Sequence, residues 1–72
     1  MKRTIVVNGK VKLWNQMWIS YEDVRDLAAL SGDVTVQYSR GLKQNPQGTL
    51  VQGQNVRVKS GMVFNIAWTG NA

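Results

Sequence analysis

A single helix signal, beginning near residue 20, lies between two stretches whose apolar residues alternate as they do in strands. Ser20 is a suitable N-cap, and Glu22 and Asp23 place negative charge in the first turn. Val24, Leu27 and Ala28 then follow at the i, i+3, i+4 spacing of one helix face, Leu30 lies on the flank of that face, and Gly32 provides a stop. The sequence therefore predicts one helix, over residues 21–30, in a chain otherwise made of strands.

The segment before the helix predicts a β-hairpin. Asn8-Gly9 is the strongest short turn signal, and it separates strands at residues 4–7 and 10–14. A two-residue turn would collect on one face Val6, Val11 and Leu13. A three-residue turn with a bulge would instead collect on one face Ile5, Val7, Val11 and Leu13. We expect the second register because it pools more apolar surface.

The segment after the helix predicts further strands separated by turns. Val34, Val36 and Tyr38 alternate with polar residues, as in a half-buried strand. A polar loop is expected over residues 40–48, then a short strand at 49–51 and a further strand that contains Val56 and Val58. The last segment has the richest apolar face, which we expect near the sheet centre: Met62, Phe64, Ile66 and Trp68.

The order ββαββ predicts an α+β fold in which one helix packs across a mixed sheet of four to five strands. A lone helix must bury its apolar stripe against a sheet, and the right-handed crossover favours parallel first and last strands at the centre. This is the β-grasp arrangement. A partly open barrel of the SH3 or OB type is the alternative. The expected core comprises Ile5, Val7, Val11, Leu13, Val24, Leu27, Ala28, Val36, Val58, Phe64 and Ile66.

The amino-acid composition limits the classes of function that this chain can have. The chain has 72 residues, which suits a single domain over 1–72, and no cysteine or histidine, which removes the usual thiolate and imidazole ligands. Glu22 and Asp26 share a helix face, but first-turn acids are usually solvated and complement the helix dipole. We therefore expect no enzymatic activity, no catalytic residue, no cofactor, no metal and no small-molecule substrate.

No apolar run is long enough for a signal peptide or a membrane span, so we expect a cytoplasmic protein without membrane contact.

An apolar cluster is the first candidate binding surface. It comprises Leu13, Trp14, Met17 and Trp18, and so small a core cannot bury all four. Tryptophan and methionine are enriched at the centres of protein interfaces. The cluster predicts either a cap on one end of the core or a contact for a partner protein of unknown identity, which includes a second copy of the chain as a homodimer.

Basic side chains are the second candidate. The formal net charge is +5, and all four acids lie in or just after the helix, so the sheet and loops should be basic. Candidate polyanion contacts are Lys10, Lys12, Arg57 and Lys59. Strand lysines also protect sheet edges and maintain solubility. A nucleic-acid partner is therefore an alternative, but we favour a protein partner.

The chain resembles the bacterial ubiquitin-like domains of the multiubiquitin type. The resemblance rests on the strings TIVVNGKVKLWN, ISYEDVRDLAAL and PQGTLVQGQNVRVKSGMVFNIAW, and it covers nearly the whole chain. It implies a β-grasp fold and a link to protein conjugation or tagging. Conjugated ubiquitin-like proteins end in Gly-Gly, whereas this chain ends Thr69-Gly70-Asn71-Ala72. Removal of the last two residues would expose Gly70, which makes Gly70 the candidate processed terminus of a conjugated modifier.

Overall fold

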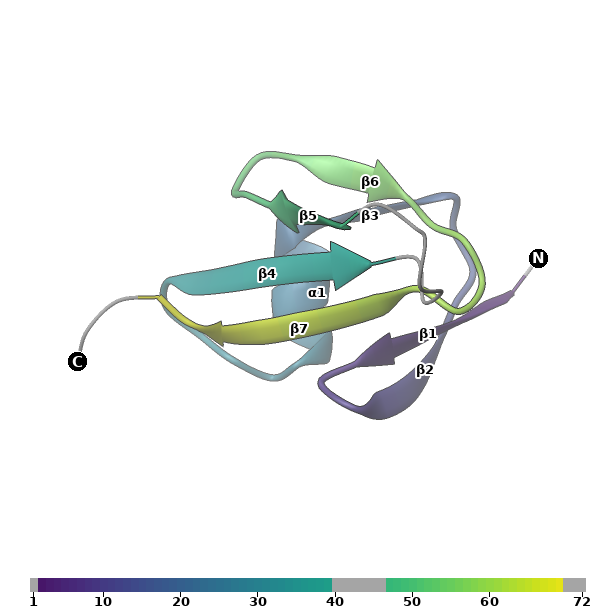
Figure 1. Ribbon diagram of the computed structural model, residues 1–72, viewed down its shortest axis with the longest axis horizontal. Coiled ribbons are helices and arrows are strands. Elements are labelled where there is room, and N and C mark those ends of the chain that lie inside the picture. The colour runs from purple at the N-terminus through teal and green to yellow at the C-terminus, as the bar shows by residue number, and fades with distance from the viewer. Residues whose placement is uncertain (1, 40–46, 70–72) are drawn as a thin grey trace.

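One helix covers one face of a five-stranded sheet in the computed structural model, which describes residues 2–39 and 47–69 (Figure 1). The elements are β1 Arg3–Val7, β2 Lys10–Trp14, β3 Trp18–Ser20, α1 Tyr21–Leu27, β4 Val34–Ser39, β5 Gln47–Leu50, β6 Asn55–Arg57 and β7 Val63–Trp68. The strand order is β2-β1-β7-β4-β5, and β3 and β6 form a separate two-stranded sheet. Most of the loop expected over residues 40–48 lies outside the described residues.

The sheet is mixed because β1 and β7 run parallel at its centre, whereas the other neighbouring strands are antiparallel. In Figure 1, α1 crosses behind β4 and β7, so the viewer looks onto the face of the sheet that the helix leaves open. These features confirm the predicted α+β β-grasp fold and the central position of the last strand. The short strand β3, which leads directly into the helix cap, was not predicted.

The helix begins where the sequence predicts and ends earlier. The Ser20 hydroxyl accepts a hydrogen bond from the Asp23 N–H at 3.0 Å, and the Asp23 carboxylate accepts one from the Ser20 N–H at 3.0 Å. The prediction that Gly32 ends the helix is wrong. Ala29 takes the left-handed conformation (φ 59°) instead, and the N–H of Leu30 donates to the Arg25 carbonyl. This bond and the one from the Ala29 N–H to the Asp26 carbonyl form a Schellman-type cap directly after the helix.

The predicted hairpin register is wrong. Val7 faces Lys10, so the turn contains only Asn8 and Gly9, and both have positive φ (50° and 82°). Asn-Gly favours this type I′ turn because its twist matches that of the flanking strands. The turn moves Val11 and Leu13 to the face opposite the helix, and they are 67% and 62% exposed.

The core lies between α1 and the sheet, and it is closed at one end by β3 and β6. Its buried side chains are Ile5, Val7, Ile19, Tyr21, Val24, Val34, Val36, Leu50, Val56, Val58, Met62, Phe64 and Ile66. The prediction that Val11 and Leu13 join this core is wrong, because the two-residue turn points them outward. Their place is taken by residues that the prediction omitted, among them Ile19, Val56 and Met62. Trp68 continues the apolar row of β7 but is 66% exposed, and its indole N–H donates to the Ser31 carbonyl at 2.9 Å.

Within residues 2–39 and 47–69, no helix combines the length and the hydropathy needed to cross a membrane.

Candidate protein-interaction surface

Apolar side chains form a continuous band on the open face of the sheet, across β2, β1 and β7. We call it the outer patch, and it comprises Val6, Val11, Leu13 and Val63. The strand register places Val11 directly opposite Val6, and Val6 directly opposite Val63. Leu13 lies two residues along β2 from Val11 and therefore on the same face. Val6 and Val63 are half-buried, so the exposed part of the patch is concentrated on the edge strand β2.

The other half of the open face is polar. Thr35 and Gln37 on β4, Asn65 on β7 and Thr49 on β5 point to the same side as the outer patch, because each alternates with a buried neighbour. Gln37 lies opposite both Asn65 and Thr49. The open face therefore has an apolar side over β2 and β1 and a polar side over β4 and β5.

The structure divides the predicted apolar cluster. Leu13 and Trp14 are adjacent on β2 and point to opposite faces of the sheet, so only Leu13 joins the outer patch. Trp14 is half-buried against the core, and its indole N–H donates to the Trp18 carbonyl at 3.0 Å. Met17 and Trp18 are 46% and 50% exposed, and the Met17 carbonyl accepts a hydrogen bond from the Val58 N–H at 2.8 Å. Trp14 thus acts partly as a cap on the core, whereas Met17 and Trp18 remain accessible.

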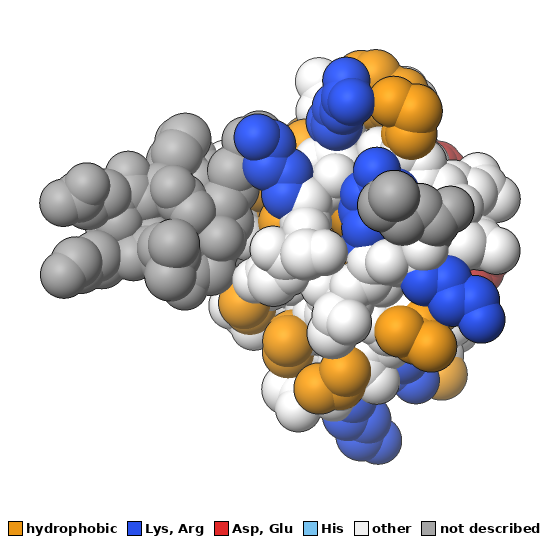
Figure 2. Space-filling view, turned by 90° about the vertical axis from the view of Figure 1, so that its right-hand side faces the viewer, with side chains coloured by type: hydrophobic (Ala, Val, Ile, Leu, Met, Phe, Trp, Pro, Cys, Tyr) orange, Lys and Arg blue, Asp and Glu red, His pale blue; other side chains and the backbone are white. Residues whose placement is uncertain are grey.

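The predicted basic contacts lie on two different sheets. Lys10 and Lys12 lie on the edge strand β2 and face the helix side, since each is opposite a buried residue of β1. Arg57 lies on β6 opposite Trp18, and Lys59 follows that strand. Figure 2 shows basic side chains spread over one end of the molecule, with uncharged and hydrophobic side chains between them and acidic ones only at the margin. The positive charge is therefore dispersed and does not follow a single groove.

The fold and this surface can be compared with known proteins. A family described as multiubiquitin matches residues 3–70. The chain belongs to the multiubiquitin family. No curated protein and no solved structure matched it. The match extends from β1 to β7 and includes the helix, so all the described elements belong to the ubiquitin-like domain.

Acidic residues of this multiubiquitin-family domain lie in the helix cap and on the helix surface. Ser20 and Asp23 are paired in the helix cap, and Asp26 is exposed on the helix surface. Among the described residues, no three acidic, histidine or cysteine side chains are grouped so that they could hold a metal ion. Gly70, the candidate processed terminus, lies outside the described residues.

Val6, Val11 and Val63 were not predicted as residues of an exposed binding surface of the multiubiquitin-family domain. The positions of two of them could have been predicted from the sequence, because Asn-Gly prefers a two-residue turn, which places Val6 and Val11 on one face. The criterion that misled the prediction was the amount of apolar surface pooled on one face of the hairpin. Val63 alternates with the predicted apolar row of the last strand, which places it on the other face, but no local pattern shows that this face lies beside Val6 of the hairpin.

Proposed function

We propose that this domain is a non-catalytic protein-binding module of the ubiquitin-like type, and that the outer patch is the surface that contacts the partner. The observation that carries the proposal is the 67% and 62% exposure of Val11 and Leu13 beside Val6 and Val63 on one face of the sheet. Contiguous exposed apolar groups, bordered by polar ones, are typical of surfaces that bind other proteins. The membership in the multiubiquitin family supports the same role.

The chemistry of the patch favours a protein over a nucleic acid. Its side chains are aliphatic, whereas single-stranded nucleic acids are held by aromatic side chains on which bases stack. The exposed aromatic residues Trp18 and Trp68 lie outside the patch. The basic residues Lys12 and Arg57 also lie on different sheets, which makes a continuous track along a phosphate backbone difficult to form.

Photo-crosslinking from single positions tests the proposal. A photoreactive amino acid replaces Leu13 in one variant and Thr49 in a second, which is exposed on the polar side of the same face. Both proteins are expressed and irradiated in the cells of origin, and adducts are analysed after nuclease treatment. We expect discrete protein adducts from the Leu13 position, and the Val11→Glu change added to the same variant should lower their yield about tenfold or more. Equal adducts from both positions, or adducts that the nuclease removes, would overturn the proposal.

We propose a place in protein tagging as the second candidate role, on the basis of the family membership alone. A conjugated modifier needs a free glycine carboxylate for activation, and cleavage after Gly70 would supply it. Mass spectrometry of the cellular protein tests this role directly. Isopeptide-linked adducts that end at Gly70 would support it, and an intact Ala72 terminus with no adducts would exclude it.

A further inference from the structure

We propose that the free edge of β2 accepts an extended segment of the partner protein as an additional strand, and that this segment alternates acidic and apolar residues. The inference rests on the proposed function and specifies the partner's chemistry. It begins from the position of β2, which is an outermost strand of the five-stranded sheet. An outermost strand can add a strand from another protein through its unpaired backbone groups.

The hydrogen bonds of β1 show which backbone groups of β2 are free. The N–H of Val6 donates to the Met62 carbonyl, and the carbonyl of Thr4 accepts from the Gly61 N–H, so both residues direct these groups away from β2. In an antiparallel pair, the residues opposite them then also direct their backbone groups away from the shared ladder. Val11 and Leu13 are those residues. Their N–H and C=O groups therefore point outward, and among the described residues no hydrogen bond reaches them.

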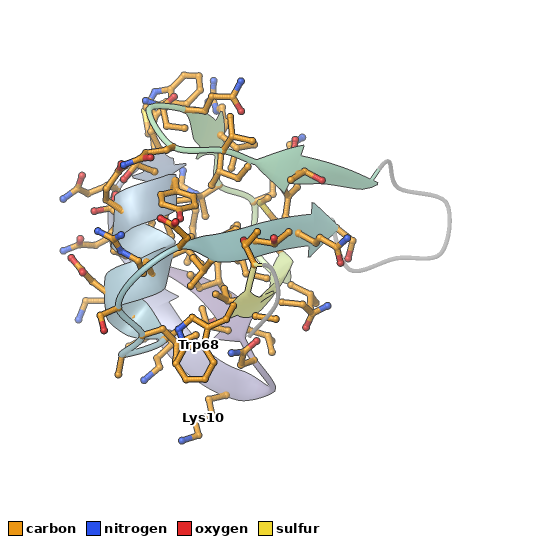
Figure 3. All side chains as sticks on the ribbon, turned by 90° about the vertical axis from the view of Figure 1, so that its left-hand side faces the viewer. Lys10 and Trp68 are labelled. Carbon is orange, nitrogen blue, oxygen red and sulfur yellow. The ribbon has the colours of Figure 1, made fainter. Side chains whose placement is uncertain are left out.

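The side chains of β2 specify the incoming strand. Val11 and Leu13 extend the outer patch, so apolar residues of an added strand would pack beside them on the open face. Lys10 and Lys12 point to the other face, and within the described chain neither forms an ion pair. Figure 3 shows Lys10 reaching away from the ribbon at the end of the sheet where Trp68 also lies. Residues of the added strand that alternate with the apolar ones would face these two lysines, and acidic side chains complement them.

A second copy of the chain fits this edge less well than an acidic segment. An antiparallel register that pairs all five residues of β2 with a second β2 places Lys12 directly opposite its own copy. Like charges directly opposite each other destabilise a strand pair, and two chains of net charge +5 repel each other as well. The charge of β2 therefore favours a different, acidic chain.

Designed peptides test the inference without knowledge of the natural partner. The probe is a capped seven-residue peptide that alternates valine and glutamate, and the control has lysine in place of each glutamate. Binding is followed by chemical-shift changes and hydrogen exchange of the backbone amides in the labelled protein. We expect the glutamate peptide to protect the Val11 and Leu13 amides, and N-methylation of its alternate amides to abolish the effect. Binding of the lysine peptide with equal affinity would overturn the inference.

Charge reversal on and off the β2 edge provides the protein variants. The double change Lys10→Glu and Lys12→Glu should weaken binding of the glutamate peptide about tenfold or more and allow the lysine peptide to bind. Lys59→Glu, a single charge reversal off the edge, should alter the affinity far less. An equal loss of peptide affinity with Lys59→Glu would show that only net charge is recognised. A dimer of the free protein formed through β2 would show that a second copy of the chain, and not an acidic segment, pairs with this edge. Either result would overturn the inference. Adducts from the Leu13 position without peptide binding would overturn this inference and leave the proposed function intact.

Discussion

Replacing Ala29 with glycine should stabilise the protein, although an Ala→Gly change usually destabilises. Ala29 has φ 59° and is exposed, so its methyl group makes no core contact that the change would remove. A left-handed residue with a Cβ atom costs about 1–2 kcal/mol, because the Cβ approaches the following carbonyl oxygen. Glycine removes that cost but adds about 0.4–1 kcal/mol of unfolded-state entropy. The net expectation is a gain of roughly 0.5–1 kcal/mol, or about 2–8 °C in melting temperature for a domain of this size.

Thermal and urea denaturation, followed by circular dichroism, measure this difference. The matched control is Ala28→Gly, since Ala28 is the preceding residue and has right-handed helical dihedrals (φ −82°, ψ −7°). The control adds the same unfolded-state entropy without relief of strain, so it should destabilise by about 0.5–1 kcal/mol. It also removes a half-buried methyl group, which adds to the destabilisation. Equal destabilisation by both changes would refute the left-handed position of Ala29 and the cap built on it.

Three further changes test the hydrogen bonds that fix the helix and the sheet, each by urea denaturation. Ser20→Ala should destabilise by about 1 kcal/mol because the helix loses its N-cap acceptor, and an unchanged midpoint would argue against the cap. Tyr21→Phe should cost about 1–3 kcal/mol because the buried hydroxyl donates to the Val34 carbonyl and accepts from the Val34 N–H; a loss far below this range would mean that solvent reaches these groups. Asn8→Gly keeps the positive φ but removes two side-chain bonds to the Ile66 backbone, so a loss of about 1–2 kcal/mol is expected, and no loss would show that these bonds add nothing.

Local chemistry explains why the start of the helix was predictable and its end was not. Ser20 and the acids behind it form a cap from adjacent residues, so the sequence alone shows the start. The end depends on Ala29 taking a conformation that alanine rarely adopts, and Gly32 is the residue that sequence reasoning selects for it. The bond from the Leu30 N–H to the Arg25 carbonyl compensates for the strain at Ala29.

Contacts between distant segments explain the remaining differences. β3 and β6 have three residues each and pair across more than thirty positions, which no local pattern indicates. They bring Ile19 and Val56 into the core, so the core does not need the apolar residues of β2. The hairpin prediction chose the register that pools more apolar surface on one face of the hairpin, and it therefore assigned Val11 and Leu13 to the core. The structure instead places both side chains on the open face, where they form the exposed part of the outer patch.

The direction of the β2 backbone groups is the feature on which the proposed binding mode depends, and amide hydrogen exchange of the free protein measures it most directly. In the two-residue register, the N–H groups of Lys10 and Lys12 are bonded to β1, whereas those of Val11 and Leu13 point outward. We expect slow exchange at the two lysines and fast exchange at the two apolar residues. Slow exchange at Val11 and Leu13 with fast exchange at the lysines would place the opposite face of β2 outward and contradict both the outer patch and the acidic partner strand.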